Sequence, residues 1–80
     1  MVTNKEITKQ YNIFSNNIKY YRKKLCYTQE MLAEKSGLSI SYIKQIESDK
    51  NYSNVTFTTI SKLSISLNVT IRDLFTKKEY

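Results

Sequence analysis

The sequence offers few side chains that could act as a nucleophile, a metal ligand or an acid/base pair. It has no histidine and only one cysteine, Cys26, so it cannot assemble a zinc site, a Cys-His nucleophile or an internal disulfide. The carboxylates are interleaved with lysines, as on solvated helix faces, and make no evident catalytic pair: Glu30, Glu34, Glu47 and Asp49 are examples. We therefore expect no enzymatic activity and no cofactor.

The chain carries an excess of positive charge. Thirteen Lys and Arg against seven Asp and Glu give a net charge of +6, with arginine only at Arg22 and Arg72. A small basic domain suggests a polyanionic partner, although solubility alone could account for the charge. The recurrence of Lys, Asn, Ile and Tyr is also typical of an AT-rich genome.

Eighty residues, 40% of them hydrophobic, predict one small folded domain over residues 1–80. The N-terminal stretch MVTNKEITKQ lacks the apolar core of a signal peptide, and no apolar run is long enough to cross a bilayer. With its single cysteine, the chain is expected to be a cytoplasmic protein.

An apolar stripe predicts the first helix. Its members are spaced by four, three, four, three and four residues: Ile7, Tyr11, Phe14, Ile18, Tyr21 and Leu25. Such a stripe also suits a short coiled-coil seam, but a single helix of this length more often packs on its own domain.

Two short helices with a glycine between them follow. Thr28 can cap a helix over Gln29 to about Ser36, and Ser39 can cap another over Ile40 to about Ser48. Gly37, the only glycine in a chain without proline, suits the positive φ angle that a tight turn between packed helices requires. The pattern predicts a helix-turn-helix, although ordinary helical hairpins share it.

Two further helices complete the predicted set. Thr56 can cap a fourth helix whose apolar residues share a face: Phe57, Ile60, Leu63 and Leu67. Thr70 and Asp73 form a capping-box variant that would start a short fifth helix, with Ile71, Leu74 and Phe75 on it. The tail, residues 76–80, is expected to fray.

The stretch R22-x5-T28-Q29-x2-L32-A33-E34-K35-S36-G37-L38-S39-x3-I43-x2-I46-E47 resembles the Cro/cI-like (XRE-type) helix-turn-helix family of bacterial and phage regulators. The resemblance continues through T59-I60-S61-K62-L63, S66-L67-N68-V69-T70 and D73-L74-F75, and covers about residues 14–75. It implies an all-α, five-helix, lambda-repressor-like DNA-binding domain in which helices 2 and 3 form the helix-turn-helix.

The resemblance also implies which residues meet double-stranded DNA. Its third helix enters the major groove, which gives these candidates for base contacts: Ile40, Ser41, Tyr42, Lys44 and Gln45. Gln45 can pair with adenine, Lys44 can donate to guanine, and Ile40 or Tyr42 can pack on a thymine methyl. The expected contacts to the DNA backbone are Gln29, Ser39, Lys50, Asn51 and Tyr52.

Other matched residues support the site. Arg22 and Glu47 correspond to a pair that bridges the first helix to the end of the third in the family, whereas Thr28, Ala33 and Gly37 shape the turn. Where the family has Glu-x-Gly and then proline, this chain has Glu47-Ser48-Asp49, no proline and a loop about two residues longer. Asp49 would repel phosphates unless it turns away.

Two functions fit these observations. The first is a sequence-specific transcriptional regulator, repressor or activator, that occupies an operator as a homodimer through Leu74 and Phe75 and has no small-molecule ligand domain. The alternative is a protein-interaction module, such as an antitoxin or an accessory factor of a mobile element, with the first helix as its partner surface. The charge and the third helix favour DNA.

Overall fold

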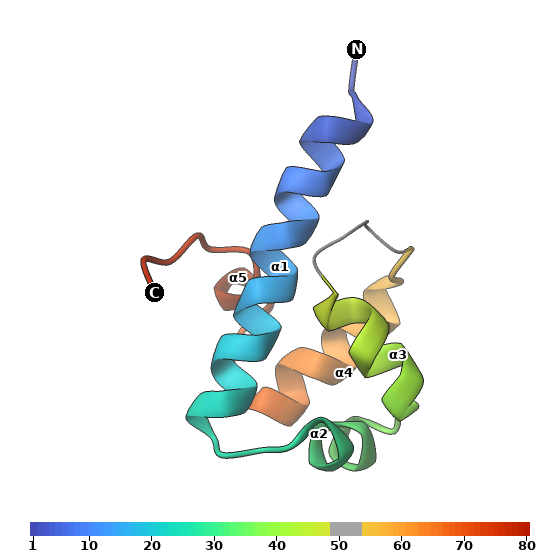
Figure 1. Ribbon diagram of the computed structural model, residues 1–80, viewed down its shortest axis with the longest axis vertical. Helices are drawn as coiled ribbons and strands as arrows, with labels where there is room; N and C mark the ends of the chain where they lie inside the picture. Colours follow the sequence, from blue (N-terminus) through green and yellow to red (C-terminus); the bar gives the residue numbers. More distant parts are fainter. Residues whose placement is uncertain (49–53) are drawn as a thin grey trace.

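The computed structural model describes residues 1–48 and 54–80, and this part of the chain contains helices and no strands. The five helices are α1 (Asn4–Lys24), α2 (Gln29–Ser36), α3 (Ile40–Glu47), α4 (Phe57–Leu67) and α5 (Ile71–Leu74). Figure 1 shows α1 as the long central element, with α3 and α4 on one side of it and α5 with the C-terminal tail on the other. The predicted all-α, five-helix fold is confirmed.

The core lies between the apolar stripe of α1 and the four shorter helices. Tyr11, Phe14, Ile18 and Tyr21 of the stripe are buried, together with Leu32, Ala33, Ile43, Ile46, Leu63, Leu67 and Leu74. The two ends of the predicted stripe are not part of the core, because Ile7 is 39% and Leu25 40% exposed. The first turns of α1 project beyond the other described helices (Figure 1).

The start of α1 is stabilised by its own side chains. Thr3 accepts a hydrogen bond from the Glu6 amide at 3.2 Å, and the Glu6 carboxylate accepts one from the Thr3 amide at 3.3 Å. This capping box satisfies helix-end donors in a stretch that has little tertiary packing. The Thr-x-x-Glu pattern could have been recognised in the sequence.

The connection between α1 and α2 contains a strained residue. Cys26 has a φ angle of 60° and an exposed side chain. Residues other than glycine pay a steric cost in this left-handed region. Cys26→Gly is therefore expected to raise the free energy of unfolding by about 0.5–1 kcal/mol, measured by urea denaturation. Cys26→Ala keeps the strain and serves as the control, so an equal gain in both variants would contradict this explanation.

The inner face of α4 differs from the predicted one at its start. Leu63 and Leu67 are buried, but Phe57 is 72% exposed and Ile60 is only half-buried. Thr56 caps the helix as predicted, through a bond from the Thr59 amide at 3.2 Å. Phe57 is the first residue of α4 and lies outside the core cluster.

Asn17 of α1 holds the end of α5 and the tail. It is fully buried, and its amide nitrogen donates to the carbonyls of Leu74 and Thr76, each at 2.9 Å. Its amide oxygen accepts from the Tyr80 hydroxyl, and the Tyr80 ring lies 5.1 Å from that of Tyr20. Residues 76–80, expected to fray, therefore lie against α1, because one buried amide satisfies the carbonyls at the end of α5.

The cap of α5 predicts a pH dependence. Hydrogen bonds from the Thr70 amide and hydroxyl hold the pKa of Asp73 below its ordinary value of 3.8. A lowered carboxyl pKa contributes stability that is present above the ordinary value and is lost as the pH falls through the pKa of the folded state. In Asp73→Asn, the free energy of unfolding should therefore decrease less between about pH 5 and about pH 2 than in the parent protein. Glu79→Gln serves as the control and should behave like the parent.

Candidate nucleic-acid interface

The turn between α2 and α3 depends on Gly37. Thr28 caps α2 through the Met31 amide at 3.0 Å, and Gly37 ends the helix in the left-handed conformation, with φ 75° and ψ 12°. The Gly37 amide donates to the Ala33 carbonyl at 2.9 Å. A Cβ atom on Gly37 would meet nothing within 4 Å, so glycine is required for its backbone angle and not for space.

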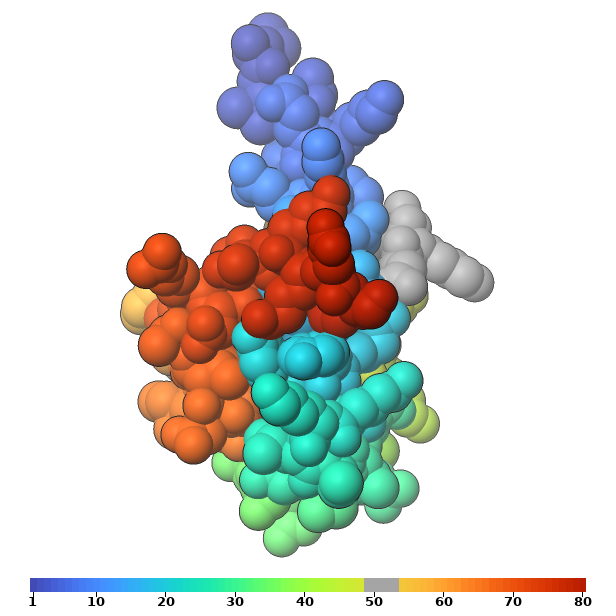
Figure 2. All heavy atoms as spheres, turned by 90° about the vertical axis from the view of Figure 1, so that its left-hand side faces the viewer, coloured from blue at the N-terminus to red at the C-terminus, as the bar shows by residue number. Residues whose placement is uncertain are grey.

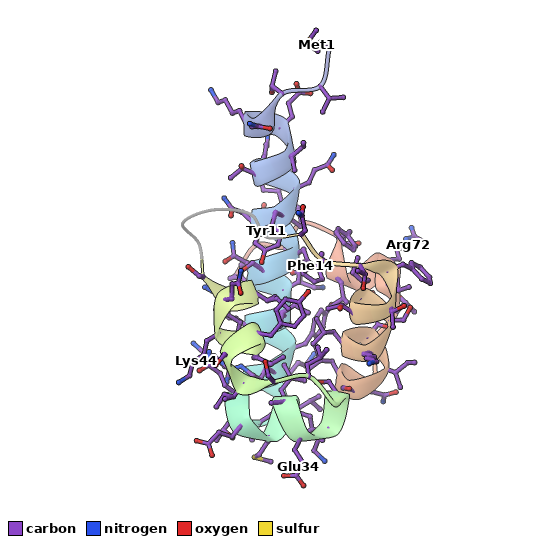
Figure 3. The ribbon with its side chains drawn as sticks, turned by 90° about the vertical axis from the view of Figure 1, so that its right-hand side faces the viewer. Met1, Tyr11, Phe14, Glu34, Lys44 and Arg72 are labelled. Atoms are coloured by element: carbon purple, nitrogen blue, oxygen red, sulfur yellow. The ribbon has the colours of Figure 1, made fainter. Side chains whose placement is uncertain are left out.

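Helix α3 presents a polar outer face. The Ser39 hydroxyl caps it, accepting from the Tyr42 amide at 3.1 Å, and Ile43 and Ile46 are fully buried beneath it. Ser41, Lys44 and Gln45 are exposed. Figure 3 shows Lys44 at the outer edge of α3. Three of the five candidate base contacts therefore share a face that a major groove could receive.

The other two candidates are less available than the sequence indicated. Ile40 and Tyr42 are half-buried and pack against the hydrophobic core. The Tyr42 hydroxyl also donates to the carbonyl of Asn54 at 3.5 Å, which tethers the chain before α4 to α3. Ile40 therefore has only part of its side chain available for a thymine methyl, because the rest has apolar partners within the domain.

An ion pair fixes the end of α3 to α1. Arg22 donates to Glu47 through Nε at 2.7 Å and through Nη2 at 2.9 Å, and its third nitrogen donates to the Tyr27 carbonyl. The Gln29 amide nitrogen donates to the same carboxylate at 3.1 Å. The Arg22 and Glu47 side chains are only 11% and 4% exposed. The network joins α1, α2 and α3, the three helices that must keep a fixed arrangement for recognition.

Tyr11 is a second tie between α1 and α3 that sequence patterns did not show. Its hydroxyl donates to the Ile46 carbonyl at 3.1 Å, in a buried position, although the stripe predicted only an apolar role for it. Tyr11→Phe is expected to lower the free energy of unfolding by about 1 kcal/mol, since it leaves a buried carbonyl without this donor. Urea denaturation measures the loss, and Tyr20→Phe, at a half-exposed position, should change less. Equal losses would argue against the hydrogen bond.

The candidate backbone contacts fall into two groups. Gln29 and Ser39 stand at the N-termini of α2 and α3, where amide groups favour a phosphate. The Gln29 side-chain amide donates one N–H to Glu47, which leaves its second N–H and the helix end for a phosphate. Lys50, Asn51 and Tyr52, with Asp49, lie outside the described residues.

The candidate dimer residues differ in exposure. Leu74 is fully buried, so its assignment to a dimer interface is corrected: the core of the same chain already covers it. Phe75 is 43% exposed and stacks on Phe14 with 5.1 Å between ring centroids. Only Phe75 keeps a surface for a second copy.

We searched the described ranges for metal-binding clusters and for membrane-spanning helices. No cluster of three or more His, Cys, Asp or Glu side chains that could hold a metal occurs in them. None of their helices combines the length and apolar character needed to span a membrane.

The packed α2 and α3, the glycine turn and the polar outer face of α3 define a helix-turn-helix DNA-binding domain. A family model described as Helix-turn-helix matches residues 18–74. The chain belongs to the XRE-type helix-turn-helix family and is a DNA-binding transcription regulator. No curated protein sequence matches it significantly.

Solved structures of similar regulators agree with this membership. The restriction-modification controller protein C.AhdI from Aeromonas hydrophila is 32% identical, with a TM-score of 0.74 over 81% of this chain and 96% of that chain. The N-terminal DNA-binding domain of SinR from Bacillus subtilis is 32% identical, with a TM-score of 0.76 over 86% and 99%. SinR, described as the master regulator for biofilm formation, has also been solved in complex with DNA; that chain is 33% identical, with a TM-score of 0.72 over 79% and 98%.

Proposed function

We propose that this protein regulates transcription by occupying a specific operator, with α3 in the major groove. The observation that carries the proposal is the exposed set of Ser41, Lys44 and Gln45 on a helix whose other face is fully buried. Lys44 and Gln45 supply the donors and acceptors that distinguish base edges, whereas Ser41 bonds to several bases. The N-termini of α2 and α3 hold phosphates on either side.

The operator is bound by a homodimer. One small domain buries too little DNA surface for tight specificity, so two copies on a palindrome, with half-sites about one helical turn apart, are expected. Phe75 contributes to the contact between the copies, because it is a large apolar residue left half-exposed beside α5. Sedimentation measurements at micromolar concentration, with and without operator, test this, and a strictly monomeric protein in both would disprove it.

Fluorescence anisotropy tests the function as a whole. The protein is titrated with labelled DNA from upstream of its own gene and with scrambled DNA, at two salt concentrations. Tighter binding to the upstream DNA by about three decades or more, with a steep salt slope, is the expected result. Equal, weak binding to upstream DNA and to a panel of random genomic fragments would contradict sequence-specific regulation. The protein-interaction module would then be the better interpretation.

A further inference from the structure

A shallow groove follows the outer face of α1, on the side where the C-terminal tail lies. Three adjoining hollows compose it: the first lies between Lys5 and Asn12 of α1, the middle one between α1 and the tail, and the third between Asn16 and Lys23. Lys9 and Asn12 line both the first and the middle hollow, and Tyr80 lines both the middle and the third. We call this feature the α1–tail groove. The 18 residue steps from Lys5 to Lys23 correspond to a length of about 27 Å.

The groove is strongly basic. Six residues of α1 share the face that lines the groove, at spacings of four, three, four, three and four, and all are lysine or asparagine: Lys5, Lys9, Asn12, Asn16, Lys19 and Lys23. The tail adds Lys77 and Lys78 to the middle hollow. Among the described residues, Glu6 is the single carboxylate that lines any of the three hollows, and it belongs to the capping box with Thr3.

This charge pattern stabilises only the end of the helix that carries it, where Lys23 lies in the last turn. Lys5 and Lys9, like Lys19 and Lys23, are four residues apart, a spacing at which like charges lower helix stability by a few tenths of a kcal/mol. Lys78 has a role in the tail, since its ammonium lies 5.3 Å from the Tyr21 ring centroid. Lys5, Lys9 and Lys23 are exposed, so a partner that carries negative charge can reach them from solvent.

The groove faces away from the candidate nucleic-acid interface. Figure 1 shows α3 and the tail on opposite sides of α1, and Figure 2, seen from the tail side, shows residues 76–80 lying across the middle of α1. A duplex held by α3 cannot also fill this groove. A ligand of the groove is consequently a second partner.

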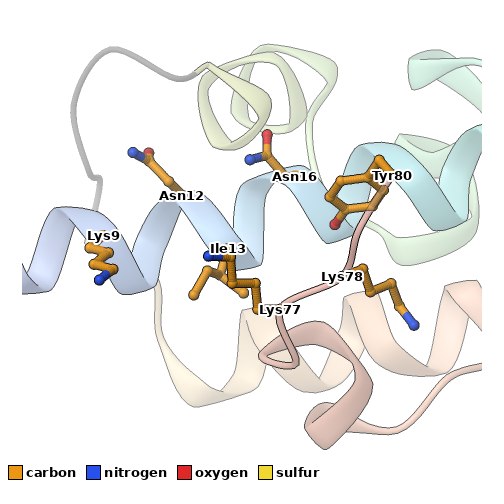
Figure 4. A pocket seen from close by; sticks show the side chains of 7 residues that line it. All are labelled: Lys9, Asn12, Ile13, Asn16, Lys77, Lys78 and Tyr80. Carbon is orange, nitrogen blue, oxygen red and sulfur yellow. The ribbon is translucent and has the colours of Figure 1, made fainter.

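The middle hollow has an apolar component. Its volume is about 290 Å³. Ile13 lines it between Lys9 and Lys77, and Tyr80 lines the end away from Lys9 (Figure 4). A space of this size suits one or two apolar side chains of a partner, with carboxylates of the same partner on the surrounding lysines. A sugar-phosphate backbone has no apolar group of this kind. Tyr20 is also no free platform for a base, because Lys24 and Lys78 each lie 5.8 Å from its ring centroid.

We propose that the α1–tail groove binds an acidic amphipathic segment of a partner protein. About 27 Å accommodates about 18 residues of helix or about eight residues of extended chain. The carboxylates of the segment meet Lys5, Lys9, Lys23 and Lys77, and its apolar residues enter the hollow beside Ile13. The regulator would thus bind DNA and a protein on opposite faces at the same time.

The test uses the full chain and a labelled 18-residue peptide with blocked ends, glutamates on one helical face and leucines at i, i+3 and i+4 spacing on the other. A second peptide has lysine in place of every glutamate. We expect the acidic peptide to bind at least about tenfold more tightly in fluorescence anisotropy and more weakly as salt is added. Nitrogen-15 NMR should show shifted amides at Lys9, Ile13 and Asn16 and none on α3.

Matched variants separate a groove from general charge attraction. Lys9→Glu with Lys77→Glu should lower the affinity for the acidic peptide about tenfold. Lys35→Glu with Lys62→Glu changes the net charge by the same amount, but on α2 and α4, and should leave this affinity nearly unchanged. Equal weakening by both pairs, shifted amides on α3, or tighter binding of a single-stranded oligonucleotide to the same face would overturn the proposal. The titration contains no duplex DNA, so its failure is separate from a failure of operator binding.

Discussion

Glu47→Ala is expected to lower the free energy of unfolding by about 3–5 kcal/mol, because removing one member of a buried ion pair leaves the other charge without compensation. Arg22 would lose two bonds of 2.7 and 2.9 Å, and Gln29 would lose its acceptor. The Glu47 side chain is only 4% exposed, so water cannot readily replace the lost partner. The free energy of unfolding of a domain of this size is only about 5–10 kcal/mol in total, so a large fraction of the variant would be unfolded at 37 °C.

Urea denaturation followed by circular dichroism measures the loss. Glu34→Ala on the exposed side of α2 is the matched control and should change the stability by less than about 0.5 kcal/mol. The double variant Arg22→Met with Glu47→Met should recover much of the loss, since replacing both partners by apolar groups leaves no buried charge. A loss below about 1 kcal/mol for Glu47→Ala would show that the pair is solvated and does not hold α3 in place.

Lys44→Ala with Gln45→Ala should strongly reduce discrimination between operator and scrambled DNA. Each base contact of this kind contributes about 1–3 kcal/mol, so the pair should reduce the ratio of specific to nonspecific affinity by roughly 30-fold or more. Both side chains are exposed on α3, and the fold should remain within about 0.5 kcal/mol of the parent. Anisotropy with both DNAs at one salt concentration measures the ratio.

The control for this double variant is Lys62→Ala, an exposed lysine on α4. This substitution should lower the affinity for both DNAs slightly and equally, because it removes a charge that attracts any DNA without contacting bases. An unchanged ratio in the α3 variant would mean that another surface reads the sequence. The α3 variant should still bind the acidic peptide, because the α1–tail groove lies on the opposite side of α1 (Figure 1).

Sequence patterns predicted the elements that depend on neighbouring residues. The caps at Thr28, Ser39, Thr56 and Thr70 all occur in the structure, and each involves an amide three residues further along the chain. Gly37 was predictable for the same reason, because a positive φ angle is a property of one residue. These local preferences, with the spacing of apolar residues, determine where the helices lie along the sequence.

The sequence resemblance also predicted the pairing of Arg22 with Glu47, which the geometry shows. The base-contact residues stay predictions. The burial of individual side chains was harder to predict from the sequence, because neighbouring apolar residues cannot be distinguished there. Leu74 is fully buried, for example, whereas Phe75 is 43% exposed. Ile40 is half-buried and packs against the core, whereas Phe57 is 72% exposed.

The sequence by itself determined the five helices, the turn at Gly37 and the basic character of the chain. Tertiary structure alone decided which side chains close the domain: Tyr11 reaches the Ile46 carbonyl 35 positions away, and Asn17 reaches the Leu74 carbonyl 57 positions away. It also brought Lys77 beside Lys9 to form the α1–tail groove. The physical reason is that caps and turns are satisfied within one helical turn, whereas a buried donor is matched only after distant helices have packed.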